Sequence, residues 1–189
     1  DCSEYSASAD SAGRGFTTIM TIQMLSDDSD MEVDHITSSW AHVYASQDVM
    51  VLAEPANDWW WFWRNSGWDD ATNIHVFDIS DPSETTYVAS GRVDGTVQDQ
   101  FSLSEHNGVI RVATTEDAWG RWWLETEEWT GPSNNVFTLA AMECMIPEGC
   151  EGDSSELVQI GHVGDIAEGE RIWSARFVGD RAYLVTFRN

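Results

Sequence analysis

The 189-residue chain carries 33 acidic and nine basic residues, all nine of them arginine, and its formal net charge is −24. Such a charge repels nucleic acid and anionic membrane surfaces, so neither is expected as a partner. Hydrophobic residues make up 42% of the chain, which is enough for a buried core. No run of 18 or more apolar residues occurs, so the sequence predicts no membrane-spanning segment.

Three β-hairpins are predicted in chain order, over residues 40–53, 98–115 and 171–188. The middle one is the clearest, because two β-prone runs, Phe101–Ser104 and Val109–Thr114, flank Asn107-Gly108, the dipeptide typical of a type I′ turn. The other two turn at Gln47-Asp48 and at Gly179-Asp180. The turns are spaced by 60 and 72 residues, counted from Gln47 to Asn107 and from Asn107 to Gly179, which indicates an internal repeat.

The segments after the first two hairpins repeat as well. Residues 73–80 match 134–140, and residues 87–93 match 157–163, where both segments run into glycine and then valine. Each unit is therefore expected to hold four short strands, which is the unit of a β-propeller blade. Blades need roughly 40–50 residues, so the excess is assigned to inserts, and inserts are expected on one face of the propeller.

Several motifs follow one another along the chain: Thr72–Ser80, Ser90–Gly95, Gln100–Gly108, Ile110–Thr115, and Gly169–Ile172 running into Arg176–Arg181. Together and in this order, they resemble the secreted β-propeller-domain proteins of bacteria and archaea. The resemblance covers about residues 16 to 189. It implies a propeller fold and an exported location, and it assigns no catalytic residue.

The expected fold is all-β, a propeller of four-stranded antiparallel blades with about three blades present, that is, a partial or truncated propeller. Residues 1–15 are expected to be a flexible N-terminal segment and residues 16–189 the propeller domain, with inserts at 54–70, 116–131 and 143–153. The remaining blades are expected to belong to a longer chain. The absence of lysine and the excess of acids suit a saline habitat, although a GC-rich genome that prefers arginine codons offers an alternative explanation.

The first two inserts are rich in tryptophan and give the best functional lead. They could form a platform on which sugar rings or a protein partner stack, or they could pack on each other as a second small core. The predicted ligand-binding residues are Trp59, Trp60, Trp61, Trp63, Trp119, Trp122 and Trp123.

The third insert contains Cys144 and Cys150, whose separation permits a local disulfide in an oxidising compartment. A metal site at these cysteines is the weaker alternative, because the nearest histidine, His162, is twelve residues further on. Cys2 is left without an obvious partner.

Charged residues in the hairpin regions are expected to form structural ion pairs between blades, and an anion site at the central channel is the alternative. They are Arg111, Glu170, Arg171, Arg176, Asp180 and Arg181.

No catalytic site and no metal site are predicted. Ser104, Glu105 and His106 are consecutive, but neighbours in one strand point to opposite faces, so a catalytic triad is not expected. No cofactor is expected, although the acidic segments 26–30, 78–81 and 151–153 offer oxygen ligands of the kind that Ca²⁺ prefers.

The sequence therefore favours an extracellular binding or interaction module, with a polysaccharide or a protein as partner and no established activity. The alternative is a propeller-type hydrolase or lyase with acidic and histidine residues at the central channel. That alternative requires such groups, for example His75, His106, Glu105 and Glu170, to converge in space.

Overall fold

The structure is a computed structural model that describes residues 5–6, 15–24, 31–38, 40–56, 70–117, 131–142 and 155–188. These residues form β-strands and one short 3-10 helix, and no α-helix occurs among them. The all-β class and the propeller architecture predicted from the sequence are confirmed.

The first complete blade contains β4 (His42–Ala45), β5 (Val49–Pro55), β6 (Ala71–Asp78) and β7 (Thr86–Asp94). Each strand pairs with the next in an antiparallel manner, so the blade is a four-stranded meander. We call it blade 1.

The second complete blade, blade 2, repeats this order with β8 (Leu103–His106), β9 (Val109–Glu116), β10 (Ser133–Met142) and β11 (Ser155–Ile166). A 3-10 helix, η2 (Gln100–Ser102), precedes it. The repeated segments of the sequence thus fall on equivalent third and fourth strands, as predicted.

Two smaller sheets flank the complete blades along the chain. On the C-terminal side, β12 (Arg171–Val178) and β13 (Arg181–Phe187) form a hairpin. On the N-terminal side, β2 (Gly15–Ile22) and β3 (Met31–Ser38) are antiparallel, and β1 (Tyr5–Ser6) pairs with β3 in parallel. The predicted flexible segment 1–15 lies largely outside the described residues.

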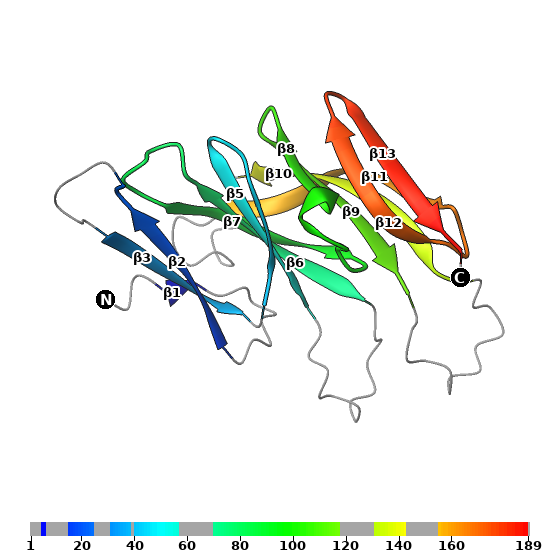
Figure 1. The fold of residues 1–189 in the computed structure, drawn as a ribbon, viewed down its shortest axis with the longest axis horizontal. Coiled ribbons are helices and arrows are strands. Elements are labelled where there is room, and N and C mark those ends of the chain that lie inside the picture. The colour runs from blue at the N-terminus through cyan, green and yellow to red at the C-terminus, as the bar shows by residue number, and fades with distance from the viewer. Residues whose placement is uncertain are drawn as a thin grey trace.

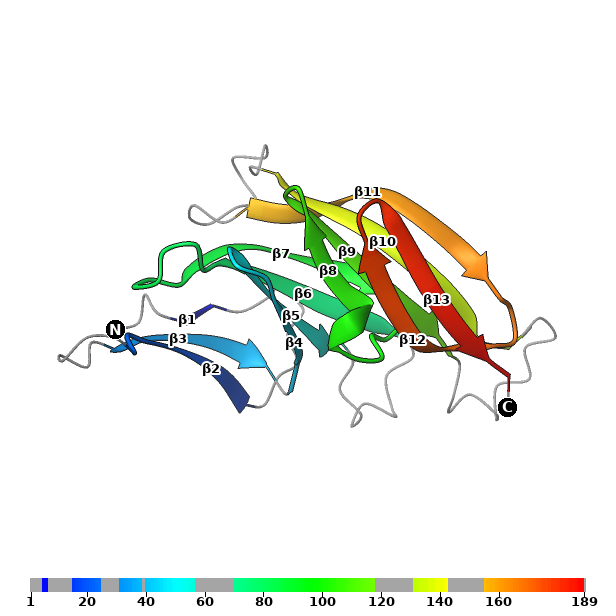
Figure 2. The same cartoon turned by 45° about the horizontal axis from the view of Figure 1, so that its top comes forward.

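The four units follow one another in space in the order of the sequence (Figure 1). The turns of the hairpins β4–β5, β8–β9 and β12–β13 lie at the same end of the molecule (Figures 1 and 2). Blades 1 and 2 also share a short parallel pairing of β7 with β11, at Ala89–Ser155 and Ser90–Glu156. This pairing joins their outermost strands into one eight-stranded sheet.

The predicted turn chemistry is present in the middle hairpin. Asn107 and Gly108 have φ values of 54° and 78°, which are the left-handed values that a type I′ turn requires at both central positions. All three predicted hairpins are confirmed, with one correction. Phe101 and Ser102 were expected to begin the first strand of the middle hairpin, but they lie in η2. The Asp99 side chain caps η2 by accepting from both of their backbone N–H groups.

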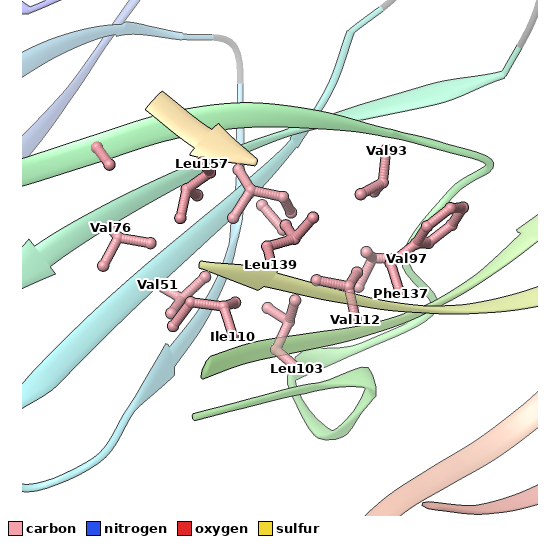
Figure 3. Packing of buried hydrophobic residues seen from close by; sticks show 13 residues of the cluster. Val51, Val76, Val93, Val97, Leu103, Ile110, Val112, Phe137, Leu139 and Leu157 are labelled. Atoms are coloured by element: carbon pink, nitrogen blue, oxygen red, sulfur yellow. The ribbon is translucent and has the colours of Figure 1, made fainter. Parts of the chain in front are cut away.

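Blades 1 and 2 face each other across one shared hydrophobic core (Figure 3). Blade 1 contributes Val51, Ile74 and Val76, and blade 2 contributes Val112 and Leu139. Each of these side chains is at most 5% exposed. Burying one such side chain contributes about 1.5–3 kcal/mol to the free energy of unfolding. The shared core therefore stabilises the packing of blade 1 against blade 2.

Candidate functional site

The two Trp-rich inserts leave the blades at one common edge. The first insert follows β5, and the backbone N–H of Ala56 donates to the carbonyl of Ala71 across its base at 2.9 Å. Asp70 precedes β6 and Asp117 follows β9, so they flank different inserts. The backbone N–H of Asp117 donates to Asp70 Oδ2 at 3.0 Å. The bases of the two inserts are therefore in direct contact, which we call the insert edge.

Further contacts fix the insert edge to its surroundings. Thr96 and Thr115 form an isolated antiparallel bridge between the two blades, and the backbone N–H of Gly95 donates to the carbonyl of Asp70. Arg171, the first residue of β12, forms an ion pair with Asp117, whose side chain is only 8% exposed. Three successive blades thus meet at this edge.

The tryptophans of the inserts lie outside the described residues. This holds for Trp59, Trp60, Trp61, Trp63, Trp119, Trp122 and Trp123, and equally for Cys144 and Cys150. The platform and the disulfide remain predictions.

A buried polar cluster lies on the side of blade 1 that faces β2 and β3. His75 is fully buried, its Nε2 lies 3.4 Å from Glu54 Oε1, and its Nδ1 lies 3.1 Å from the hydroxyl of Tyr87. A carboxylate oxygen only accepts, so Nε2 is the donor toward Glu54, and the Tyr87 hydroxyl is the hydrogen-bond partner of Nδ1. His75 and Glu54 are buried and Tyr87 is half-buried, and the contacts of the cluster fix β5, β6 and β7 relative to one another.

We expect Tyr87 to ionise at a higher pH than an ordinary tyrosine. Burial is the main cause that raises its pKa, the Glu54 carboxylate adds to the rise, and a hydrogen bond to Ser90 opposes it. A raised pKa of Tyr87 in the folded state adds to the free energy of unfolding. This contribution is fully present below the pKa of tyrosine in the unfolded chain, about 10, and it is lost as pH rises through the pKa of Tyr87 in the folded state.

An ultraviolet absorbance titration measures this ionisation. Replacing Tyr87 with Phe should remove one absorbance change from the titration, at a pH above about 10. Tyr183→Phe, which removes an exposed phenol, is the matched control. A step lost in Tyr87→Phe at or below the ordinary value would contradict the expectation.

The run Ser104–His106 does not form a catalytic arrangement. Ser104 Oγ accepts from Arg111 Nη2 at 2.8 Å, and Glu105 Oε1 accepts from the backbone N–H of Gly108 at 2.8 Å. Glu105 therefore caps the hairpin turn. His106 lies beside Asp180 on the turn of the next blade, with 3.5 Å between Nε2 and Oδ1.

Arg111 joins blade 2 to the β12–β13 hairpin. Its Nη1 donates to the carbonyl of Gly179, and its guanidinium lies 5.0 Å from the centre of the Phe177 ring. Arg176 makes a contact in the opposite direction, from β12 to η2, with its guanidinium 3.7 Å from the centre of the Phe101 ring. These two arginines cross the seam between successive blades mainly through backbone and aromatic contacts, and not through carboxylates.

The other charged residues of this group lie around the same hairpin. Glu170 accepts from the hydroxyl of Thr186 at 2.5 Å, which ties the base of β12 to the end of β13. Arg171 pairs with Asp117, as described above. Arg181 is exposed at the start of β13, opposite Val178.

Asn134 is the seam residue whose role the sequence did not reveal. Its side chain is fully buried. Its Nδ2 donates to the carbonyl of Ile166 at 2.8 Å and to the carbonyl of Glu170 at 3.0 Å. Its Oδ1 accepts from the Thr115 hydroxyl at 2.7 Å and from the backbone N–H of Ile172 at 3.1 Å. The side chain uses its full hydrogen-bonding capacity. The available signal in the sequence was the asparagine that begins both repeated segments, Asn73 and Asn134.

The acidic segment at 78–81 is a pair of capped turns. Asp78 accepts from the backbone N–H of Ser80, and Asp81 accepts from the backbone N–H and the hydroxyl of Ser83. Hydrogen bonds from Ser80 lower the pKa of Asp78, and those from Ser83 lower the pKa of Asp81. Within the described parts of the chain, no group of three or more His, Cys, Asp or Glu residues could hold a metal ion.

The groups that an enzyme would need at the channel are separated. His75 is buried within blade 1, and His106 and Glu105 lie at the turn of the β8–β9 hairpin. Glu170 precedes β12, whereas the contact of His106 with Asp180 lies beyond the other end of β12. An eight-residue strand spans roughly 26 Å at about 3.3 Å per residue, so these groups do not converge.

The order of strands, the repeated meanders and the shared faces define a β-propeller. Comparison with known proteins agrees, since the model of the β-propeller domain family matches residues 1–189, and the chain belongs to this family. Over 101 residues, 53% of this chain, it is 34% identical to an uncharacterized protein of Methanocaldococcus jannaschii. Over 131 residues, 64% of this chain, it is 29% identical to an uncharacterized protein of Archaeoglobus fulgidus.

The chain spans only a small part of these relatives, 13% of the first and 16% of the second. No solved structure matches it significantly. Among the described residues there is no helix with the length and hydrophobicity needed to cross a membrane.

Proposed function

We propose that this chain is part of an exported binding module of the β-propeller type, and that its ligand docks at the insert edge. The observation that carries this proposal is the hydrogen bond between Asp117 and Asp70. It joins the bases of two inserts that hold nine of the eleven tryptophans of the chain. The two aromatic inserts are therefore attached to the blades at neighbouring positions.

The chemistry of the inserts favours a polysaccharide as the ligand, with a protein as the other partner to be tested. Indole rings stack on the apolar faces of sugar rings, and carboxylates accept hydrogen bonds from sugar hydroxyls. Glu116 is exposed at the insert edge, where its Oε1 accepts from Asn135 Nδ2 at 2.7 Å. The proposed ligand is neutral or cationic, because a polyanion would be repelled by the net charge of −24.

Export is proposed together with this function. It rests on the resemblance to secreted propeller proteins and on the predicted Cys144–Cys150 disulfide, which needs an oxidising compartment. A saline habitat would suit the same acidic surface.

The test is binding of neutral polysaccharides by affinity electrophoresis. The double variant Trp60→Ala and Trp122→Ala should lose retention while its melting temperature stays within a few degrees of the original. Trp173→Ala is the matched control, because Trp173 is 71% exposed on β12 and lies outside both inserts. Loss of the fold in the double variant, or retention unchanged by it, would contradict the proposal.

A further inference from the structure

Three hydrogen-bonded polar side chains cross blade 2 beside the insert edge. Glu116 is exposed at the end of β9, Asn135 is 4% exposed on β10, and His162 is exposed on β11. Asn135 Nδ2 donates to Glu116 Oε1 at 2.7 Å, and 2.9 Å separates Asn135 Oδ1 from His162 Nε2. A buried amide therefore connects two exposed groups, and we call these three residues the polar bridge.

The carboxylate of Glu116 sets the orientation of the whole polar bridge. A carboxylate oxygen only accepts hydrogen bonds, so the amide of Asn135 turns its Nδ2 toward Glu116 and its Oδ1 toward His162. An amide oxygen also only accepts, so Nε2 is the donor toward Asn135. In a neutral imidazole the other ring nitrogen, Nδ1, is then an acceptor.

The imidazole of His162 is held in one position. It stacks on the ring of Phe137, with 4.4 Å between the ring centres and 2° between the ring planes. Gly164 leaves space for this ring, because a Cβ at that position would lie 3.1 Å from His162 Nε2 and 2.9 Å from Asn135 Oδ1. Phe137 belongs to the core shared by the two blades, so a buried part of the molecule fixes an exposed ring.

The groups that the polar bridge leaves unused are acceptors. Within the described residues, neither His162 Nδ1 nor Glu116 Oε2 has a hydrogen-bond partner. Glu116 forms no ion pair among them either, and the guanidinium of Arg171 at the same edge pairs with Asp117. Two unused acceptors fit a ligand that offers several donors, as the hydroxyl groups of a sugar do.

We propose that the polar bridge is the polar subsite of the insert edge, where Glu116 Oε2 and His162 Nδ1 accept hydrogen bonds from the hydroxyl groups of a neutral polysaccharide. This inference rests on the ligand site proposed above and adds the residues that select the ligand. Glu116 directly precedes Asp117, so the subsite begins where the second insert is attached. Asn135 and Gly164 are positioning residues, because they orient the two acceptors and do not contact the ligand.

Affinity electrophoresis of the whole chain in dextran, xylan, galactomannan and a soluble β-glucan tests the subsite. On the polysaccharide that retards the original chain, Glu116→Gln should weaken binding by about tenfold or more, because it exchanges a charged acceptor for an N–H donor. His162→Phe keeps a ring stacked on Phe137 and removes the acceptor, so it should weaken binding by about threefold to tenfold.

Glu156→Gln and His106→Phe are the matched controls. They make the same chemical changes at the other end of blade 2, where β11 begins and where β8 turns into β9, and should bind like the original. Gly164→Ala tests the positioning without changing a polar group. Its Cβ must displace His162 or Asn135, so affinity should fall by about threefold or more. Melting temperatures within a few degrees of the original show that each variant is folded.

Nitrogen NMR of the histidine rings reports the contact directly. When the polysaccharide is added, the Nδ1 resonance of His162 should shift and that of His106 should stay in place. A His162 whose Nδ1 carries the proton in the neutral ring, or whose resonance is unchanged by a bound polysaccharide, would overturn the proposal.

The outcomes separate this inference from the proposed function. If the double tryptophan variant loses retention while Glu116→Gln and His162→Phe bind normally, the subsite is wrong and the proposed function stands. No retention of the original chain on any of the four polysaccharides would overturn both. Equal losses in Glu116→Gln and Glu156→Gln would assign the effect to net charge and would overturn the subsite.

Discussion

Phe137→Ala is expected to lower the free energy of unfolding by about 3–5 kcal/mol, the usual range for a buried phenylalanine. Phe137 is 2% exposed, pairs with Val112 across β9 and β10, and stacks on the ring of His162 with 4.4 Å between the ring centres. The truncation leaves a cavity in the core that joins blades 1 and 2. A domain of this size loses about 2–4 °C of melting temperature per kcal/mol, so a fall of roughly 10 °C is expected by calorimetry.

Phe187→Ala is the matched control for this substitution. Phe187 is 58% exposed on β13, so the same chemical change should alter the stability by no more than about 0.5 kcal/mol. Equal losses in the two variants would show that Phe137 is not buried in a shared core.

The second large effect is expected for Asn134→Ala. This substitution removes four hydrogen bonds, including the donations to the carbonyls of Ile166 and Glu170. The backbone N–H of Ile172 keeps its second acceptor, Thr115 Oγ1. Each unsatisfied buried group costs about 1–3 kcal/mol, so a total loss of about 3 kcal/mol or more is expected in urea denaturation.

Thr138→Ala, on the same strand but only half-buried, serves as the control and should cost less than about 1 kcal/mol. Asn134→Asp keeps the size of the side chain but replaces the two N–H donors with a carboxylate oxygen, which can only accept and carries negative charge. A stability close to the original in Asn134→Asp would contradict the role assigned to the donations to Ile166 and Glu170.

The hairpins and the blade repeat could be predicted from the sequence because their causes are local. Asn107-Gly108 specifies a turn through its backbone conformation alone, and the alternation in residues 73–80 and 134–140 depends only on the two-residue period of a strand. The place where β8 begins could not be predicted in the same way. Asp99 caps η2 by accepting from Phe101 and Ser102, and this local competition converts two β-prone residues into a 3-10 turn.

The contacts of the seam depend on which residues of different blades become neighbours, and the sequence carries little of that information. Charged residues near the hairpins were predicted to form ion pairs between blades, and Arg171 does pair with Asp117. Arg111 contacts the carbonyl of Gly179 and Arg176 contacts the ring of Phe101, and the sequence does not show either of these partners. The cluster of Glu54, His75 and Tyr87 joins three strands and has no local signature. The contact between Asp70 and Asp117 bridges 47 residues of sequence, and only the fold reveals that the bases of the two inserts meet.

Native-state amide hydrogen exchange tests most directly whether the two complete blades form one cooperative unit. The amides of Val51, Ile74, Val112 and Leu139 come from both blades and lie around the shared core. They should exchange only through global unfolding, and hence with the same free energy of opening. Opening free energies that differ between β5–β6 and β9–β10 by more than about 1 kcal/mol would contradict this, because such blades would unfold independently.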